Sequence, residues 1–129
     1  MGEISSRYFV NEGNKALVVS REHGYRRSIY VRATNRSNIT LTPRVGLGTV
    51  STTVASVLTG DALVPGASCD ILIEAIDDSD NKFEETYLFL YYSYDASQDA
   101  SDIGEGVEFS LTQDTCSDML FFVDEGVSV

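Results

Sequence analysis

The stretch Ser28–Thr34, with the sequence SIYVRAT, alternates apolar and polar side chains along its whole length. Positions 29, 31 and 33 are apolar, whereas positions 30, 32 and 34 carry polar or amphipathic side chains. Successive side chains of a β-strand point to opposite faces of its sheet, so a period of two marks a strand that buries one face. The stretch therefore predicts a half-buried strand.

The same period of two recurs along the chain, and the 3.6-residue period of an amphipathic helix does not. It appears in residues 39–42, 69–75 and 107–111, and a last apolar run covers residues 119–123. We count about eight or nine short strands separated by turn residues. This spacing predicts an all-β fold: a two-sheet antiparallel sandwich, immunoglobulin-like or related.

The sequence makes a separate prediction for each of three connections between strands. The polar residues after Thr34 predict a hairpin between the strand of residues 28–34 and that of residues 39–42. The sequence Val64-Pro65-Gly66-Ala67 predicts a tight turn. Residues 95–106 are rich in Ser, Asp, Ala and Gly, so we expect an exposed, mobile loop there.

Residues 86–94 read TYLFLYYSY and are apolar at odd and even positions alike. Such a run predicts a central strand covered on both faces, or a strand whose outer face joins an interface. Tyrosine is a favoured interface residue. The candidate interaction residues of this run are Tyr87, Tyr91, Tyr92 and Tyr94.

The formal net charge of −11 is unevenly distributed. Residues 1–44 hold eight cationic side chains against three carboxylates, a balance of +5, whereas residues 45–129 hold only Lys82 against 17 carboxylates, a balance of −16. The negative total opposes binding to nucleic acid. Either the basic strands neutralise acidic ones within a monomer, or the basic part of one copy meets the acidic part of the next. Arg26, Arg27 and Arg32 are the candidate contacts.

The chain has the length of a single domain, in which residues 25–129 form the sandwich body. Residues 1–24 are a possible N-terminal arm, or edge strands able to add to a neighbour's sheet. No run of about 20 apolar residues is present, so we expect no membrane-spanning helix. The first seven residues lack the features of a secretory signal, so the sequence is expected to be intracellular or already mature, including a virion component.

The sequence contains few candidate catalytic residues. His23 is the only histidine, and no nucleophile-elbow pattern accompanies it. We therefore expect a protein that is not an enzyme and uses no cofactor. The two cysteines, Cys69 and Cys116, are able to pair, but the inward alternation of Cys69 with Ile71 favours a reduced thiol. Two glycosylation sequons begin at Asn35 and Asn38.

Carboxylates are plentiful enough to raise calcium binding as an alternative. The first cluster contains Asp77, Asp78, Asp80 and Glu84, and the second contains Asp95, Asp99, Asp102 and Glu105. Neither matches the spacing of an EF-hand loop. We therefore expect no metal site and read both clusters as solvated loops, with calcium at the first cluster as the minor alternative.

The turn Leu63-Val64-Pro65-Gly66 leads into the alternating strand Cys69–Ile73. With the strands before it, this layout resembles that of two kinds of small sandwich: immunoglobulin-like domains of the major sperm protein type, and the aegerolysin and actinoporin cytolysins. The resemblance covers residues 28–76, is one of layout and not of motif, and implies only a fold.

Together these features predict a non-catalytic interaction or structural subunit that binds protein, most simply copies of itself, as capsid, tail, filament or coat proteins do. The alternative is a lipid- or glycan-binding sandwich of the aegerolysin or actinoporin kind. Tryptophan, which those cytolysins use at membranes, is absent here.

Overall fold

A computed structural model of the chain describes residues 3–20, 27–48, 56–76, 85–114 and 121–124. Strands account for nearly all the regular structure of these residues, and one short 3-10 turn, η1, lies at Ala100–Asp102. The strands are β1 (Glu3–Val10), β2 (Lys15–Ser20), β3 (Arg27–Asn35), β4 (Thr42–Gly48), β5 (Ser56–Thr59), β6 (Ser68–Ile76), β7 (Glu85–Ser93), β8 (Val107–Asp114) and β9 (Phe121–Asp124).

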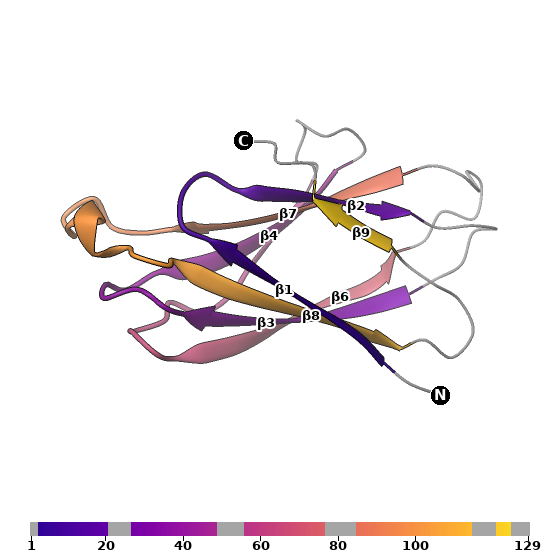
Figure 1. Ribbon diagram of the computed structural model, residues 1–129, viewed down its shortest axis with the longest axis horizontal. Coiled ribbons are helices and arrows are strands. Elements are labelled where there is room, and N and C mark those ends of the chain that lie inside the picture. Colours follow the sequence, from indigo (N-terminus) through magenta and orange to yellow (C-terminus); the bar gives the residue numbers. More distant parts are fainter. Residues whose placement is uncertain (1–2, 21–26, 49–55, 77–84, 115–120, 125–129) are drawn as a thin grey trace.

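The strands form two antiparallel sheets that pack against each other (Figure 1). One sheet has four strands in the order β1-β8-β3-β6, and the other has five in the order β5-β4-β7-β2-β9. The predicted all-β, two-sheet antiparallel sandwich is therefore confirmed.

The strand order identifies the kind of sandwich. Among the described strands, only β4 and β5 follow one another in the chain and share a sheet, and every other connection passes from one sheet to the other. The orders β1-β8-β3-β6 and β2-β7-β4-β5 are those of an eight-stranded jelly roll, with β9 added beside β2. This strand order differs from that of an immunoglobulin domain.

The expected hairpin between residues 28–34 and 39–42 is wrong. β3 pairs with β6 and β8, whereas β4 pairs with β5 and β7 in the opposite sheet. Ile39 and Leu41 do face the core, as their alternation predicts. An inward row looks the same in sequence whether the next strand pairs with its predecessor or crosses the core to face it.

Asn35, which is fully buried, holds the crossing from β3 to β4 in place. Its side-chain nitrogen donates to the carbonyls of Ile39 and Leu63, both at 2.7 Å. Its side-chain oxygen accepts from the backbone nitrogen of Ser37 at 2.8 Å and from the hydroxyl of Ser37 at 2.6 Å. Every hydrogen-bonding group of this amide is used, so the first sequon has no accessible acceptor nitrogen in the fold.

The core lies between the two sheets. The four-stranded sheet contributes Ile29, Val31, Phe109 and Leu111, among others, and the five-stranded sheet contributes Leu17, Val45, Leu88 and Leu90. On the other face of β7, Phe89 pairs with Ala16, and both side chains are fully buried. β7 is thus a central strand covered on both faces, as its composition predicts.

The described part of residues 1–24 contains β1 and β2, which pair within the two sheets. β1 is an edge strand that pairs with β8 along its whole length, as the edge-strand alternative expects. β2 lies between β7 and β9, and its residues Ala16 and Leu17 are fully buried. β1 pairs with β8 on one side and is the edge of its sheet, so strand addition to a neighbour stays a prediction.

The loop from Tyr94 to Gly106 is exposed, as expected, but it is tied to the β3–β4 connection. The side chain of Gln98 accepts from the backbone nitrogen of Thr40 at 2.8 Å and donates to its carbonyl at 2.9 Å. The backbone nitrogen of Asn38 donates to the carbonyl of Asp102 at 2.9 Å. These bonds fix the loop at one end of the sandwich.

The predicted turn at residues 64–67 is also present. Ala67 donates from its backbone nitrogen to the carbonyl of Val64 at 3.0 Å, and Gly66 has a φ of 85°. Proline followed by glycine with positive φ is the arrangement of a type II turn.

Candidate functional site

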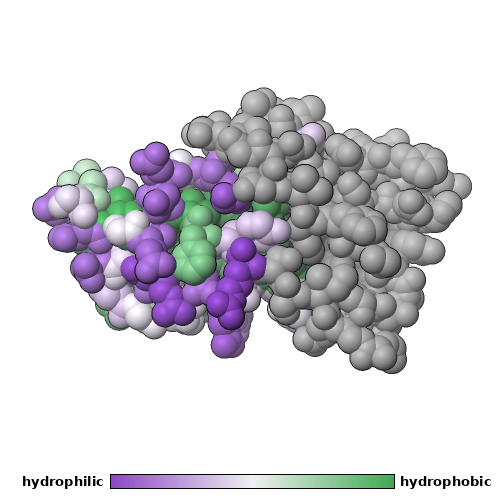
Figure 2. Space-filling view, viewed as in Figure 1, coloured by the Kyte–Doolittle hydropathy of each residue, from purple (hydrophilic) through white to green (hydrophobic). Residues whose placement is uncertain are grey.

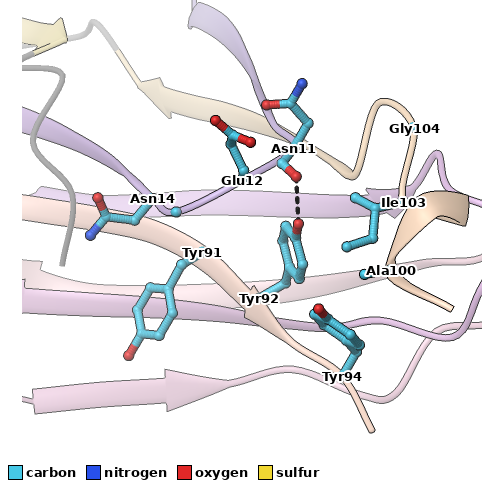
Figure 3. A pocket seen from close by; sticks show the side chains of 10 residues that line it. Asn11, Glu12, Asn14, Tyr91, Tyr92, Tyr94, Ala100, Ile103 and Gly104 are labelled. Carbon is cyan, nitrogen blue, oxygen red and sulfur yellow. Dashed lines mark hydrogen bonds between the residues drawn. The ribbon is translucent and has the colours of Figure 1, made fainter. Parts of the chain in front are cut away.

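The loop end of the sandwich contains an open cleft of about 680 Å³ (Figure 3). Three segments form it: the β1–β2 turn at residues 11–14, the end of β7 and the β7–β8 loop. Ligand sites commonly have volumes of about 300–1,000 Å³. The cleft is therefore large enough for a small molecule or for part of a larger one.

Tyr91, Tyr92 and Tyr94 line the cleft, as do Ala100 and Ile103 from the loop opposite. The rings of Tyr92 and Tyr94 have centroids 6.2 Å apart and planes inclined by 40°. In Figure 3 the three rings point in different directions along the strand and do not enclose one point. Tyr92 and Tyr94 form the aromatic wall of the cleft, whereas Tyr91 points to the other side of the strand.

The hydroxyl of Tyr92 donates to the carbonyl of Asn11 at 2.6 Å and so joins β7 to the β1–β2 turn (Figure 3). Burial raises the pKa of Tyr92, and the neighbouring Tyr94 and Glu12 raise it further. Tyr92 therefore keeps its proton near neutral pH and remains a donor. Its ring also packs against the core, which makes it the positioning residue of the cleft.

Two buried polar groups lie beside Tyr91. In the described part of the chain, neither side-chain polar atom of Asn14 has a hydrogen-bond partner, and the Nε of Arg44 has none either. Asn14 lines the cleft, whereas Arg44 is opposite Tyr91 in the β4–β7 ladder and does not line it. A buried polar group without a partner costs about 1–3 kcal/mol. Such groups are uncommon in native proteins.

The loop end is acidic. Glu12 is the one acidic residue, and no basic residue is present, among the described residues that line the cleft. Asp95, Asp99, Asp102 and Glu105 are exposed on the adjoining loop. Hydrogen bonds from Ser97 lower the pKa of Asp95, and hydrogen bonds from Ser101 lower that of Asp99. Both carboxyls are thus ionised at neutral pH.

A second surface is the outward face of the four-stranded sheet, hereafter the arginine face. It comprises the exposed side chains of Arg7, Phe9, Tyr30, Arg32, Arg36, Asp70 and Leu72 together with the nearly buried Glu108. Phe9, Tyr30 and Leu72 are 45%, 58% and 43% exposed, respectively. Figure 2 shows hydrophobic atoms, in green, among hydrophilic ones, in purple, on the described part of the visible surface. Large apolar side chains are thus accessible on three strands of one sheet.

The charges of the arginine face are partly balanced within the molecule. Arg32 donates to both carboxylate oxygens of Asp70, at 2.9 and 3.3 Å, and this bond lowers the pKa of Asp70. Glu108 is approached at 2.8 Å by Arg36 and at 3.5 Å by Arg7, whose side chain is 71% exposed. Two guanidinium groups share one carboxylate, so the described residues of this face carry three arginines against two carboxylates.

The predicted interaction residues lie in different places in the structure. Three of the four tyrosines, Tyr91, Tyr92 and Tyr94, meet at the cleft, whereas Tyr87 lies further along β7 beside Gly48. Arg32 lies on the arginine face. The side chain of Arg27 is outside the described structure, and the whole of Arg26 is too.

The other residues that the sequence singled out form no metal site in the part of the chain that the structure describes. Asp77, Asp78, Asp80, Glu84, His23 and Cys116 lie outside the described residues. The described residues contain no group of three or more potential metal ligands. Cys69 is a free thiol against the core, and burial raises its pKa. No helix within the described ranges is long and apolar enough to cross a membrane.

Sequence reasoning missed Asn11, Glu12 and Asn14 as cleft residues. The residues Asn11-Glu12-Gly13-Asn14 read as an ordinary turn, and the pairing of Lys15 with Leu90 is what brings that turn beside Tyr91. Only the register between two strands far apart in the chain carries this information.

Comparison of the chain with protein-family models, with curated proteins and with solved structures finds no match.

Proposed function

We propose that this chain is a non-catalytic structural subunit that acts by binding protein, and that its partners are copies of itself. The observation that carries the proposal is the arginine face, where Phe9, Tyr30 and Leu72 are all substantially exposed. An isolated exposed apolar residue is ordinary. Tyr30 and Leu72 are directly paired across β3 and β6, so they form one apolar surface that gains free energy by being covered. Phe9 lies four residues further along the same face.

The residue types of the arginine face fit a protein partner. Aromatic residues and arginine are enriched at protein interfaces, whereas lysine is depleted. The described part of this face has three arginines and no lysine. Arginine also suits interfaces because its planar guanidinium group binds carboxylates through two parallel hydrogen bonds.

The acidic loop end supplies the complementary surface on a second copy. Residues 95–106 contain four carboxylates and no lysine or arginine. The arginine face and this loop end are different patches of one molecule, so a contact between them joins copies head to tail. Repetition of such a contact produces a closed ring or an open filament.

The architecture is compatible with this role by analogy of fold alone. Viral capsid subunits use the jelly roll, as do lectin domains. Capsids, tails, filaments and coats are all built by repeated contacts between copies of one chain. The positive balance of residues 1–44 and the negative balance of residues 45–129 support such contacts.

The test is a pair of matched surface variants studied by sedimentation velocity. Leu72→Asn removes an exposed apolar side chain from the arginine face, and Val64→Asn removes one that is 61% exposed in the turn before β6. We expect Leu72→Asn to weaken self-association about tenfold and Val64→Asn to leave it unchanged. Equal association of both variants and the parent chain, or a parent chain that does not associate, contradicts the proposal.

A further inference from the structure

We propose that the tyrosine-lined cleft at the loop end binds a neutral carbohydrate. This function is separate from self-assembly and uses a different surface. The cleft combines an aromatic wall, hydrogen-bonding groups of both kinds and an absence of lining cations in the described residues.

The aromatic wall suits the apolar faces of sugar rings. A pyranose presents C–H groups on its faces, and the negative face of an aromatic ring attracts them through its quadrupole. Tyr94, which is 40% exposed and lies beside Tyr92, offers such a surface at the end of β7.

The polar lining suits hydroxyl groups, each of which donates and accepts hydrogen bonds. The Glu12 carboxylate accepts, and an asparagine amide does both. The side chain open to a ligand is that of Asn11, which is exposed, whereas both polar atoms of the Asn14 amide are buried. The bond from Tyr92 to Asn11 holds these groups beside the aromatic wall.

The charge of the loop end selects a neutral ligand. Glu12 and the ionised Asp95 and Asp99 repel phosphate, sulfate and sialic acid groups. Small quaternary ammonium ions bind aromatic cages whose rings surround one point. The tyrosines of this cleft do not form such a cage (Figure 3).

The experiment screens the full chain against a panel of neutral oligosaccharides built from hexoses, N-acetylhexosamines and fucose. Sialylated glycans and choline are included as separate probes. Affinities are then measured in solution with free oligosaccharide. Because the chain has no tryptophan, tyrosine emission reports binding directly.

Three variants locate the site. We expect Tyr94→Ala and Glu12→Gln each to weaken binding of the neutral oligosaccharide about tenfold. Tyr30→Ala removes an exposed tyrosine from the arginine face and is the matched control, so its affinity should equal that of the parent chain. Circular dichroism checks that each variant is folded.

Three outcomes overturn the proposal. They are the absence of binding to every neutral oligosaccharide at millimolar concentration, binding only to sialylated glycans or to choline, and binding that Tyr94→Ala and Glu12→Gln leave unchanged.

Discussion

The side-chain oxygen of Asn35 accepts two hydrogen bonds from Ser37, one from its backbone nitrogen and one from its hydroxyl. With the two bonds that its nitrogen donates, this amide fixes the chain where it crosses from one sheet to the other. Asn35 therefore stabilises the connection between the two sheets and is not available at the surface.

Asn35→Asp is expected to destabilise the fold by about 3 kcal/mol or more, because a carboxylate cannot donate to the carbonyls of Ile39 and Leu63 and is costly to bury. Asn38→Asp is the control, since Asn38 is exposed in the same connection. Urea unfolding measures both. If the two variants have the same free energy of unfolding, the assigned role of Asn35 is wrong.

Gly106→Ala is expected to cost about 3 kcal/mol or more, since it adds steric overlap to backbone strain. A Cβ at Gly106 meets the carbonyl oxygen of Val10 and comes within 2.8 Å of the Cα of Asn11, at a φ of 72°. Gly104 has a φ of 55° but open space around it, so Gly104→Ala should cost only about 1–2 kcal/mol. Thermal or urea unfolding that ranks the two variants in the opposite order would refute the close approach of β1 to this loop.

Because of Tyr92, the free energy of unfolding is expected to fall as the pH becomes alkaline. Its pKa is raised above the ordinary value of 10.0, so the fold favours the neutral hydroxyl. The resulting stabilisation is complete below the ordinary pKa and is lost as the pH rises through the raised value. Over pH ~8 to ~11, Tyr92→Phe should lose less stability than the parent chain. Identical pH profiles for Tyr92→Phe and the parent chain would count against this role.

Deletion of residues 1–24 is expected to prevent folding of the remainder. It removes β1 from the edge of one sheet and β2 from the interior of the other, including the fully buried Ala16 and Leu17. Circular dichroism and the chemical-shift dispersion of amide protons measure the effect. A folded 25–129 fragment would show that the first two strands are dispensable and would support the idea of an arm.

The sequence predicts the strands and their buried faces wherever the alternation of apolar and polar residues is regular, as in residues 28–34 and 107–111. It also predicts the turn at Pro65-Gly66, because proline and glycine have specific backbone requirements. It does not predict strand pairing, since an inward row at Ile39 and Leu41 is compatible with a hairpin and with a crossing. Three of the four predicted tyrosines line one cleft, and their role in binding stays a prediction. The role of Asn35 was hidden because buried and solvated asparagines look alike in a turn.

The most direct test of the account is the molar mass of the intact chain by size-exclusion chromatography with light scattering, at ~50 mM and ~500 mM salt. Self-assembly through the arginine face and the acidic loop end predicts a mass above the 14.1 kDa of one chain at low salt, which rises with protein concentration and falls at high salt. A mass of 14.1 kDa at both salt concentrations, maintained at high protein concentration, would contradict it.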